Sequence, residues 1–367
     1  MSSAKDGHNY APSSSKPNRV VEPGEFVFAV AHLDHGHING MTNGLLEAGA
    51  TLKYVFEPNE QKRDAFRQAY ADSGVQPADS LERILDDPEV KLVASAAVPN
   101  RRGPLGCRVM AAGKDYFTDK CPFTTLAQLA DARESAARTG RKYLVYYSER
   151  VHVESAWYAD ELIRGGAIGE IVHMAITGPH RLNKAVRPEW FFRKEEYGGI
   201  LTDICSHQFD QFLHYSRAQG GDILHARVEN FANPDRPELE DFGEAVMRLD
   251  TGASCLSRVD WFTPDGLRGW GDGRTFLVGT KGVMEIRKYF DFGRSDEGNL
   301  IILADGESEQ EIRVGGQVGF PFFGLLIQDC LERTENAMTQ AHAFMAAELS
   351  LQAQAYADAR RSPGPVT

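Results

Sequence analysis

The chain has 367 residues and a net charge of −12, from 52 acidic and 40 basic side chains. This length predicts about two domains. The negative charge argues against a nucleic-acid binder, which must neutralise phosphates, and against a polybasic membrane-surface protein. No apolar run reaches the ~18 residues of a membrane span, and the first 24 residues lack the apolar core of a secretory signal. We therefore expect a cytoplasmic protein with neither a nucleic-acid nor a membrane partner.

The first half of the chain alternates between apolar, strand-like runs and helical segments. Such alternation with short loops predicts an α/β fold with a doubly wound parallel sheet, the Rossmann type, over residues 25–147. Residues 1–24 are polar and rich in Ser and Pro, and we expect a flexible tail or an arm packed on a partner subunit. The expected strands lie at 26–31, 51–58, 91–99, 115–122 and 142–148.

The second half differs because strand-like runs follow one another without intervening helices. This order predicts an α+β domain with an antiparallel or mixed sheet over residues 148–335. Helices are expected at 152–166 and 202–215, and a C-terminal helix and tail at 336–367.

The turn after the first strand lacks the glycine fingerprint of dinucleotide-binding folds. His32, Asp34 and His37 stand where the three glycines of GxGxxG would fall. Gly36, Gly40 and Gly44 recur every fourth residue instead, which allows a helix to approach the sheet closely.

An acidic residue, Glu57, follows the second strand at the distance expected for a group that accepts the ribose hydroxyls of NAD. Its charge would repel the 2′-phosphate of NADP, so we expect NAD to be preferred. Asn100, directly after the third strand, is placed to contact the cofactor ribose. The full set expected at the cofactor is His32, Leu33, Asp34, His35, Glu57, Pro99, Asn100 and Lys120.

The run from His32 to His37 also contains residue types that ligate zinc. The alternative is a polar turn in which Asp34 caps the following helix through backbone N–H groups. We favour the capped turn and assign no metal site.

Asp34 brings a negative charge to the turn where a pyrophosphate would lie. Protonation of a neighbouring histidine would offset this repulsion. We therefore expect NAD to bind weakly or with displaced phosphates, and better at about pH 6 than at about pH 8.

Three residues of types suited to acid–base chemistry occur in recognisable surroundings: Lys120 in TDKCP, and Asp203 and His207 in GGILTDICSHQFD. With VFEPN, AAVPN, RGGAIGEIVH and VGTKGVMEI, these segments make the chain similar to the glucose–fructose oxidoreductase, inositol dehydrogenase and rhizopine-catabolism (Gfo/Idh/MocA) family. The family's EKP lysine matches Lys120, and its DxxxH pair matches Asp203 and His207. The chain departs from the family at Cys121, where proline is usual, and at the glycine fingerprint.

The resemblance implies NAD-dependent hydride transfer between a nicotinamide and a hydroxyl carbon of a sugar, polyol or glycoside. His207 would take the hydroxyl proton, Lys120 would stabilise the alkoxide, and Asp203 would orient the substrate. The resemblance also implies a homo-oligomer, a dimer or a tetramer. The residues expected at a sugar-sized pocket are His180, Arg181, Arg187 and Trp190.

Two other functions remain open. A redox-neutral lyase or glycosidase would oxidise its sugar transiently and return the hydride, so it would retain NAD without net NADH production. A non-catalytic ligand sensor would explain the missing glycines, but such a sensor needs no Lys120, Asp203 and His207.

Overall fold

The computed structural model describes residues 7, 10–14 and 16–360. The chain divides into two compact units. The parallel-sheet unit comprises His8–His152 and Gly316–Phe344, and the mixed-sheet unit comprises Met1–Gly7, Val153–Gly315 and Met345–Thr367. The chain thus leaves the first unit a few residues later than the expected boundary, and a later segment returns to it.

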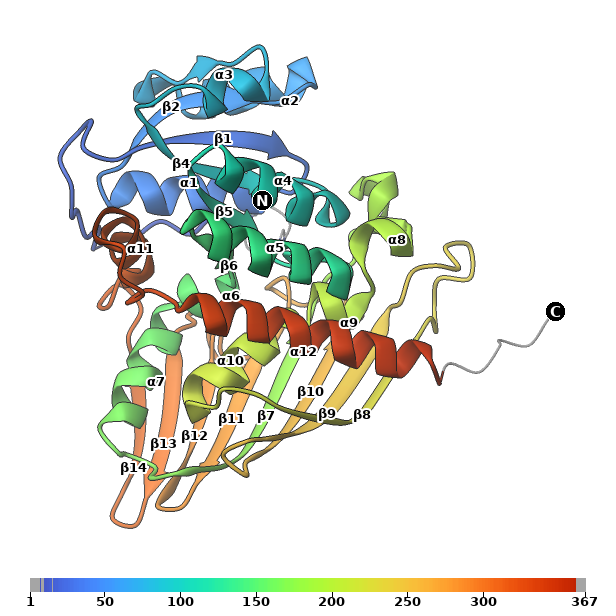
Figure 1. The fold of residues 1–367 in the computed structure, drawn as a ribbon. Coiled ribbons are helices and arrows are strands. Elements are labelled where there is room, and N and C mark those ends of the chain that lie inside the picture. The colour runs from blue at the N-terminus through green and yellow to red at the C-terminus, as the bar shows by residue number, and fades with distance from the viewer. Residues whose placement is uncertain (1–6, 8–9, 15, 361–367) are drawn as a thin grey trace. The chain divides into compact units, whose positions relative to one another are not determined.

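The parallel-sheet unit is built on six strands in the order β3-β2-β1-β4-β5-β6 (Figure 1). The paired strands run parallel, as predicted for a doubly wound sheet. The chain order of the strands reverses between β1 and β4, and in sheets of this type ligands bind beside such a reversal, at the carboxyl ends of the strands. The strands are β1 (Val27–Leu33), β2 (Thr51–Phe56), β3 (Gln76–Pro77), β4 (Val90–Ala96), β5 (Asp115–Asp119) and β6 (Tyr143–Tyr146).

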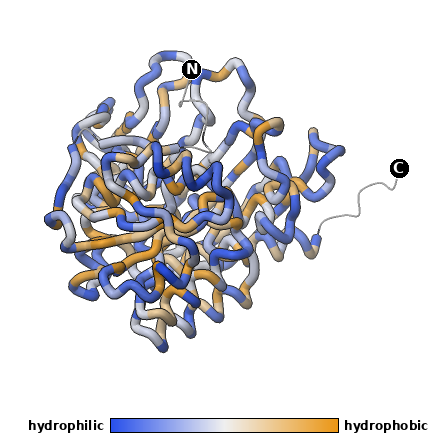
Figure 2. Tube along the Cα trace, turned by 90° about the horizontal axis from the view of Figure 1, so that it is seen from above, coloured by the Kyte–Doolittle hydropathy of each residue, from blue (hydrophilic) through white to orange (hydrophobic). Residues whose placement is uncertain are grey.

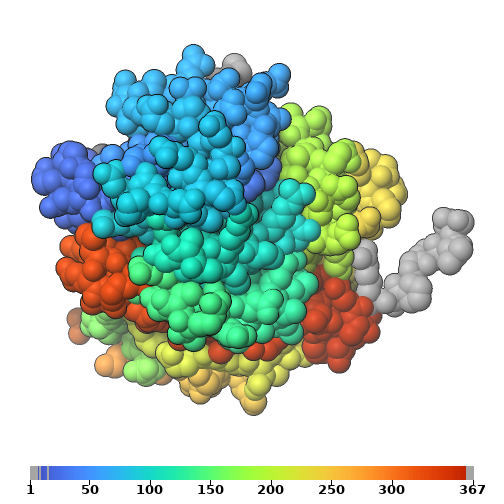
Figure 3. Space-filling view, turned by 45° about the horizontal axis from the view of Figure 1, so that its top comes forward, coloured from blue at the N-terminus to red at the C-terminus, as the bar shows by residue number. Residues whose placement is uncertain are grey.

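Helices cover both faces of this sheet, as two neighbouring residues of β5 show. Consecutive strand residues point to opposite faces. The Tyr116 ring lies where a Cβ on Gly106 of α4 would fall, whereas the Phe117 ring contacts Phe322 and Phe323 of α11. Figure 3 shows α4 and α5 side by side on the outer surface. The helices are α1 (His37–Glu47), α2 (Glu60–Ala69), α3 (Leu81–Leu85), α4 (Pro99–Ala111), α5 (Leu126–Thr139), α6 (Ser148–Val151) and α11 (Pro321–Glu332), with a 3₁₀ turn at η3 (Ala71–Ser73).

The described part of the N-terminal segment lies against its own unit. The Tyr10 hydroxyl donates to the carbonyl of His152 at 3.1 Å, and the Ser14 N–H donates to the Glu47 carboxylate. The Val20 N–H donates to the carbonyl of Ala48. The expected free tail or partner-bound arm therefore does not describe residues 10–14 and 16–24. Residues 1–6, 8–9 and 15 lie outside the described part.

The mixed-sheet unit contains eight strands in the order β14-β13-β12-β11-β7-β10-β9-β8. Only the pairing of β7 with β10 is parallel among the pairs of this sheet that the structure describes. The strands are β7 (Ile171–Pro179), β8 (Gly221–Glu229), β9 (Phe242–Leu249), β10 (Ser254–Asp260), β11 (Arg274–Gly279), β12 (Gly282–Arg287), β13 (Leu300–Asp305) and β14 (Glu309–Arg313). The predicted α+β class is confirmed.

Helices pack on one face of the mixed sheet and leave the other face open. On β11, Thr275 and Leu277 are buried, whereas Phe276 and Val278 are exposed. The strand register places Phe276 in one row with Ala175, Leu256 and Val246. Along the chain trace, short apolar stretches alternate with hydrophilic ones (Figure 2). The helices of this unit are α7 (Glu154–Arg164), η4 (Lys184–Val186), η5 (Glu189–Phe192), α8 (Lys194–Tyr197), α9 (Ile200–Asp203), α10 (Ser206–Ser216) and most of α12 (Gln340–Asp358).

The buried imidazole of His152 makes the stability of the parallel-sheet unit sensitive to acid. Its Nδ1 lies 2.5 Å from the Tyr146 hydroxyl, and its ring packs on Phe320 and Phe323. Burial lowers the pKa of His152 to about 3, from 6.5. Below pH 6.5 this imidazole binds a proton in the unfolded chain but not in the folded chain. The free energy of unfolding therefore falls as the pH falls.

We expect this imidazole to remove about 1.4 kcal/mol of stability between about pH 7.5 and pH 5.5. His152→Gln should flatten the pH dependence of urea unfolding by about this amount, whereas His225→Gln, at an exposed strand position, should leave it unchanged. An equal slope in wild type and His152→Gln would contradict the assignment.

Candidate functional site

The candidate site lies at the carboxyl edge of the parallel sheet, where four strands end beside the reversal in strand order. The loops after β1, β2, β4 and β5 carry the residues predicted to contact a cofactor. The structure therefore brings together at one edge His32, Leu33, Asp34, His35, Glu57, Pro99, Asn100 and Lys120. All of them belong to the parallel-sheet unit.

His32 occupies a backbone conformation that normally selects glycine. Its φ is +65°, and it stands at the first position of the missing glycine fingerprint. Its ring packs edge-on against Phe56 at 5.4 Å. Burial lowers the pKa of His32, although Asp34 and Glu57 act in the opposite direction. This shift works against the protonated His32 that was expected to offset Asp34.

Asp34 does not cap the helix that follows, which corrects the expected capped turn. Gly36 occupies the N-cap position of α1 and has no side chain to donate or accept. Asp34 lies two residues earlier, where its carboxylate accepts from Lys62 Nζ at 3.0 Å and from the Val98 N–H at 3.3 Å. The residue thus joins the first turn to α2 and to the loop before α4, and Lys62 offsets its charge.

Glu57 is held in place by two main-chain groups. Its Oε2 accepts from the Leu33 N–H at 2.8 Å, and its Oε1 accepts from the Asn59 N–H at 2.9 Å. The side chain is buried. Because each carboxylate oxygen has a second lone pair, the group can still accept from two hydroxyls of a ribose.

Asn100 presents a buried oxygen that has no hydrogen-bond partner among the described residues. Its main-chain carbonyl accepts from Gln128 Nε2 at 2.8 Å, which fixes the start of α4. Buried acceptors are nearly always satisfied in folded proteins, so an unpartnered amide oxygen at this edge fits a ligand hydroxyl.

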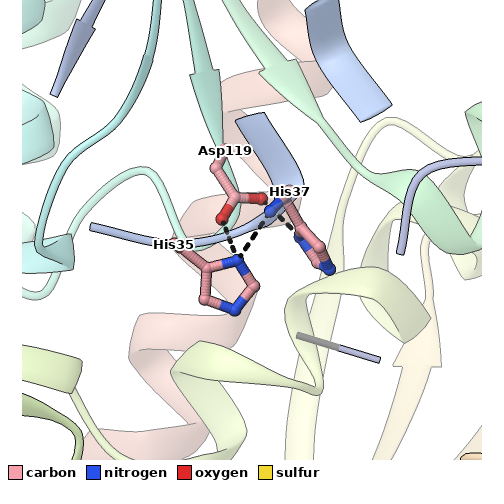
Figure 4. Close-up of side chains that lie close together, drawn as sticks. All are labelled: His35, His37 and Asp119. Atoms are coloured by element: carbon pink, nitrogen blue, oxygen red, sulfur yellow. Dashed lines mark hydrogen bonds and ion pairs between the residues drawn. The ribbon is translucent and has the colours of Figure 1, made fainter. Parts of the chain in front are cut away.

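Asp119, the last residue of β5, collects donors from three segments, of which Figure 4 shows the one that carries His35 and His37. Its Oδ1 lies 2.9 Å from His37 Nδ1 and accepts from the Lys120 N–H at 2.8 Å. Its Oδ2 lies 3.3 Å from His35 Nδ1 and 3.2 Å from an Arg102 nitrogen. Burial acts to raise the pKa of Asp119, but His37 and Arg102 lower it on balance, so the group stays ionised.

The sequence interpretation missed Asp119 and Arg102. The position of Asp119 at a strand end, directly before Lys120, is a signal that could have revealed it. Arg102 is buried and donates to the carbonyls of Ala97, Lys120 and Cys121. A second arginine, Arg101, precedes it and is exposed, so composition alone could not single out Arg102.

The mixed-sheet unit carries Asp203 and His207, both buried. They were expected on one helix, but the structure ends α9 at Asp203 and starts α10 at Ser206. The reason is local hydrogen bonding, since the Cys205 N–H donates to Ile200 and the His207 N–H donates to Ile204. The two side chains therefore flank a break rather than sharing a continuous helix.

Arg181, one of the two arginines predicted to contact substrate, holds main-chain atoms of its own unit. The guanidinium of Arg181 donates to the carbonyls of Pro264, Leu267 and Gly269 and to Asp265. It thereby fixes the loop at 264–269, and a direct contact of Arg181 with substrate remains a prediction.

Aromatic rings surround the other three predicted substrate residues. The Arg187 guanidinium lies over Phe191 and Trp261. His180 packs against Trp261 and Trp270, and Trp190 lies edge-on to Phe191. A substrate role for His180, Arg187 and Trp190 also remains a prediction.

Comparison with known proteins places the chain in a family. A family model described as the GFO/IDH/MocA C-terminal domain matches residues 157–285. A crystal structure from Erwinia carotovora atroseptica, of a protein provisionally named an oxidoreductase, is 44% identical with a TM-score of 0.88. The match covers 91% of this chain and 99% of that one. The chain belongs to the Gfo/Idh/MocA family.

More distant relatives extend the comparison. D-xylose dehydrogenase of Paenarthrobacter nicotinovorans is 26% identical over 134 residues, 35% of this chain and 34% of that protein. The chain thus matches only about a third of the length of its curated relatives. Levoglucosan dehydrogenase, in complex with NADH and levoglucosan, shares the fold at 16% identity, with a TM-score of 0.75 over 92% of this chain and 98% of that one.

Within the Gfo/Idh/MocA family, the chain departs from the usual pattern in its first turn, which has His32, Asp34 and His37 in place of the fingerprint glycines. Among the helices that the structure describes, none is long and apolar enough to cross a membrane.

Proposed function

We propose that this protein is an NAD-dependent enzyme that transfers a hydride between the nicotinamide and a hydroxyl carbon of a sugar, polyol or glycoside. The observation that carries the proposal is the Glu57 carboxylate, fixed by two N–H groups at the end of β2 beside the first turn. The name of D-xylose dehydrogenase and the NADH complex of levoglucosan dehydrogenase support it. A cytoplasmic location agrees with the five free cysteines.

The residues at the sheet edge fit a dinucleotide. Glu57 would accept the hydroxyls of one ribose, and the buried Asn100 oxygen would accept from another hydroxyl. The N-terminus of α1 would face the phosphates, as in other dinucleotide-binding folds. When bound, the nicotinamide supplies the hydride chemistry.

The chain's own groups would handle the proton of the reacting hydroxyl. We assign its removal to His207, whose imidazole suits general base catalysis near neutral pH. Lys120 would donate to the same oxygen and stabilise its developing negative charge. Asp203 would bind a neighbouring hydroxyl and thereby orient the sugar.

A first prediction concerns the choice of cofactor. The fixed charge of Glu57 should make NAD bind at least about tenfold more tightly than NADP, because the carboxylate repels a 2′-phosphate. Glu57→Gln should reduce this preference, whereas Glu60→Gln, at an exposed position in the first turn of α2, should not. Equal dissociation constants of the wild type for NAD and NADP by calorimetry would contradict it.

A second prediction tests the charge of the first turn. The Lys62 ammonium pairs with Asp34, so Lys62→Gln should expose the repulsion and weaken NAD binding several-fold. Asp34→Asn in the same background should restore binding, because the charge that Lys62 compensates is gone.

The double-mutant cycle separates this effect from local damage. If the effects of Lys62→Gln and Asp34→Asn on the free energy of NAD binding simply add, the two charges do not act together on NAD. Repulsion between Asp34 and the phosphates is then not the reason for weaker binding.

A third prediction concerns the proton. Lys120→Ala or His207→Ala should lower turnover at least ~10²-fold on a substrate found by screening aldoses and polyols for NADH formation. NAD binding should persist. Lys114→Ala offers a matched control, because Lys114 is a buried lysine at the opposite end of β5. Near-normal turnover of Lys120→Ala or His207→Ala would reject the assignment.

We further propose that the protein forms a homo-oligomer through the open face of the mixed sheet. Leu256 and Phe276 are exposed there, and Val283 adds a third apolar side chain on β12. Burial of such a face stabilises association.

Light scattering should give a dimer or tetramer for the wild type and a smaller species for Phe276→Asp. A monomeric wild type would exclude the proposal.

A further inference from the structure

We infer that His35, His37 and Asp119 form a binding site for a divalent transition-metal ion of the zinc type. The three side chains come from the turn after β1, the first residue of α1 and the last residue of β5. Figure 4 shows both imidazoles directed at the carboxylate. The inference goes beyond the proposed function, because no contact of NAD or of a sugar enters it.

The spacing of the donor atoms suits a common ion. The ring nitrogens lie 2.9 Å and 3.3 Å from the two carboxylate oxygens, and the donor atoms of all three residues lie within 4.8 Å of one another. Ligands of a tetrahedral zinc ion with bonds of about 2.0–2.1 Å are separated by about 3.3 Å. Small rotations of the side chains would therefore bring all three to one ion.

The ring nitrogen of His35 lies between a main-chain donor and the Asp119 carboxylate. Its Nδ1 lies 3.2 Å from the N–H of His37, which calls for a lone pair, and 3.3 Å from Asp119 Oδ2, which also carries lone pairs. Nδ1 of a neutral imidazole has one in-plane lone pair, so it would exchange the His37 N–H for an ion when the ring turns toward Asp119. Two imidazoles and one carboxylate are a donor set typical of catalytic zinc and other first-row metals.

Hydrogen bonds from neighbouring residues fix the orientation of the Asp119 carboxylate, as a metal ligand requires. The Lys120 N–H donates to Oδ1, and Arg102 donates to Oδ2. Such outer hydrogen bonds orient metal-binding carboxylates in known sites. Arg102 also brings a positive charge that opposes the ion, but three main-chain carbonyls take up its other donors. The charge balance therefore calls for an anionic or polar oxygen, from water or a bound ligand, in the remaining position.

The test uses the full chain, stripped of metal with a chelator and free of NAD. We expect Co²⁺ titration to give the visible absorption of a four-coordinate ion with one equivalent bound, and Zn²⁺ to displace it. His35→Gln and His37→Gln should each weaken Co²⁺ binding at least tenfold, since each removes one of three protein ligands. His32→Gln, in the same turn but outside the cluster, should bind Co²⁺ as the wild type does.

Absence of a stoichiometric Co²⁺ complex in the wild type would overturn the proposal. Equal affinity in wild type, His35→Gln and His37→Gln would place any bound ion elsewhere and would also overturn it. Circular dichroism of each variant shows that lost binding is not lost folding. NAD titration of the metal-free protein measures the proposed function separately, so either proposal can fail without the other.

Discussion

The buried carboxylate of Asp119 is the constraint on which the edge of the parallel sheet depends. A charge with no exposed surface is stable only when donors surround it. Here the donors come from the turn after β1, from α4 and from the chain that leaves β5. The Asp119 side chain thereby fixes the relative positions of the start of α1, of α4 and of the chain after β5. The Lys120 main chain is among the groups that it holds.

This constraint explains how the first turn forms without its glycines. In the usual fingerprint, glycines let the main chain approach a pyrophosphate. In this chain His37 points its ring at Asp119, Asp34 pairs with Lys62, and His32 adopts the left-handed conformation that glycine normally provides. Side-chain contacts thus hold the turn in a conformation for which the usual fingerprint relies on the flexible backbone of glycine. The cost of the left-handed His32 is offset by its packing on Phe56.

Much of this arrangement could be predicted because it depends on local patterns. The alternation of apolar strands and helices is enough to predict the doubly wound sheet, and strand ends place Glu57, Asn100 and Lys120 at one edge. The pairing of His37 with Asp119 could not be predicted, because 82 residues separate them and only strand order brings them together. The same limit applies to Arg102 and Arg101, which differ in burial but not in sequence character. Strands β13 and β14 and helix α11 were not predicted, since short apolar or charged runs do not identify their own secondary structure.

The local charge at this edge differs from that of the whole chain, whose net charge is −12. Three cationic side chains, those of Lys62, Arg102 and Lys120, stand near three carboxylates at this edge, those of Asp34, Asp119 and Glu57. Because cations and carboxylates balance in number at this edge, an anionic ligand would meet less repulsion here than the net charge of the chain suggests. In a fingerprint turn, glycine N–H groups bind phosphate at any pH. In this chain imidazoles and paired charges occupy these positions, so side-chain contacts rather than glycine N–H groups hold the turn. A turn of this composition can therefore keep the fold of its family while it presents different groups to a bound phosphate.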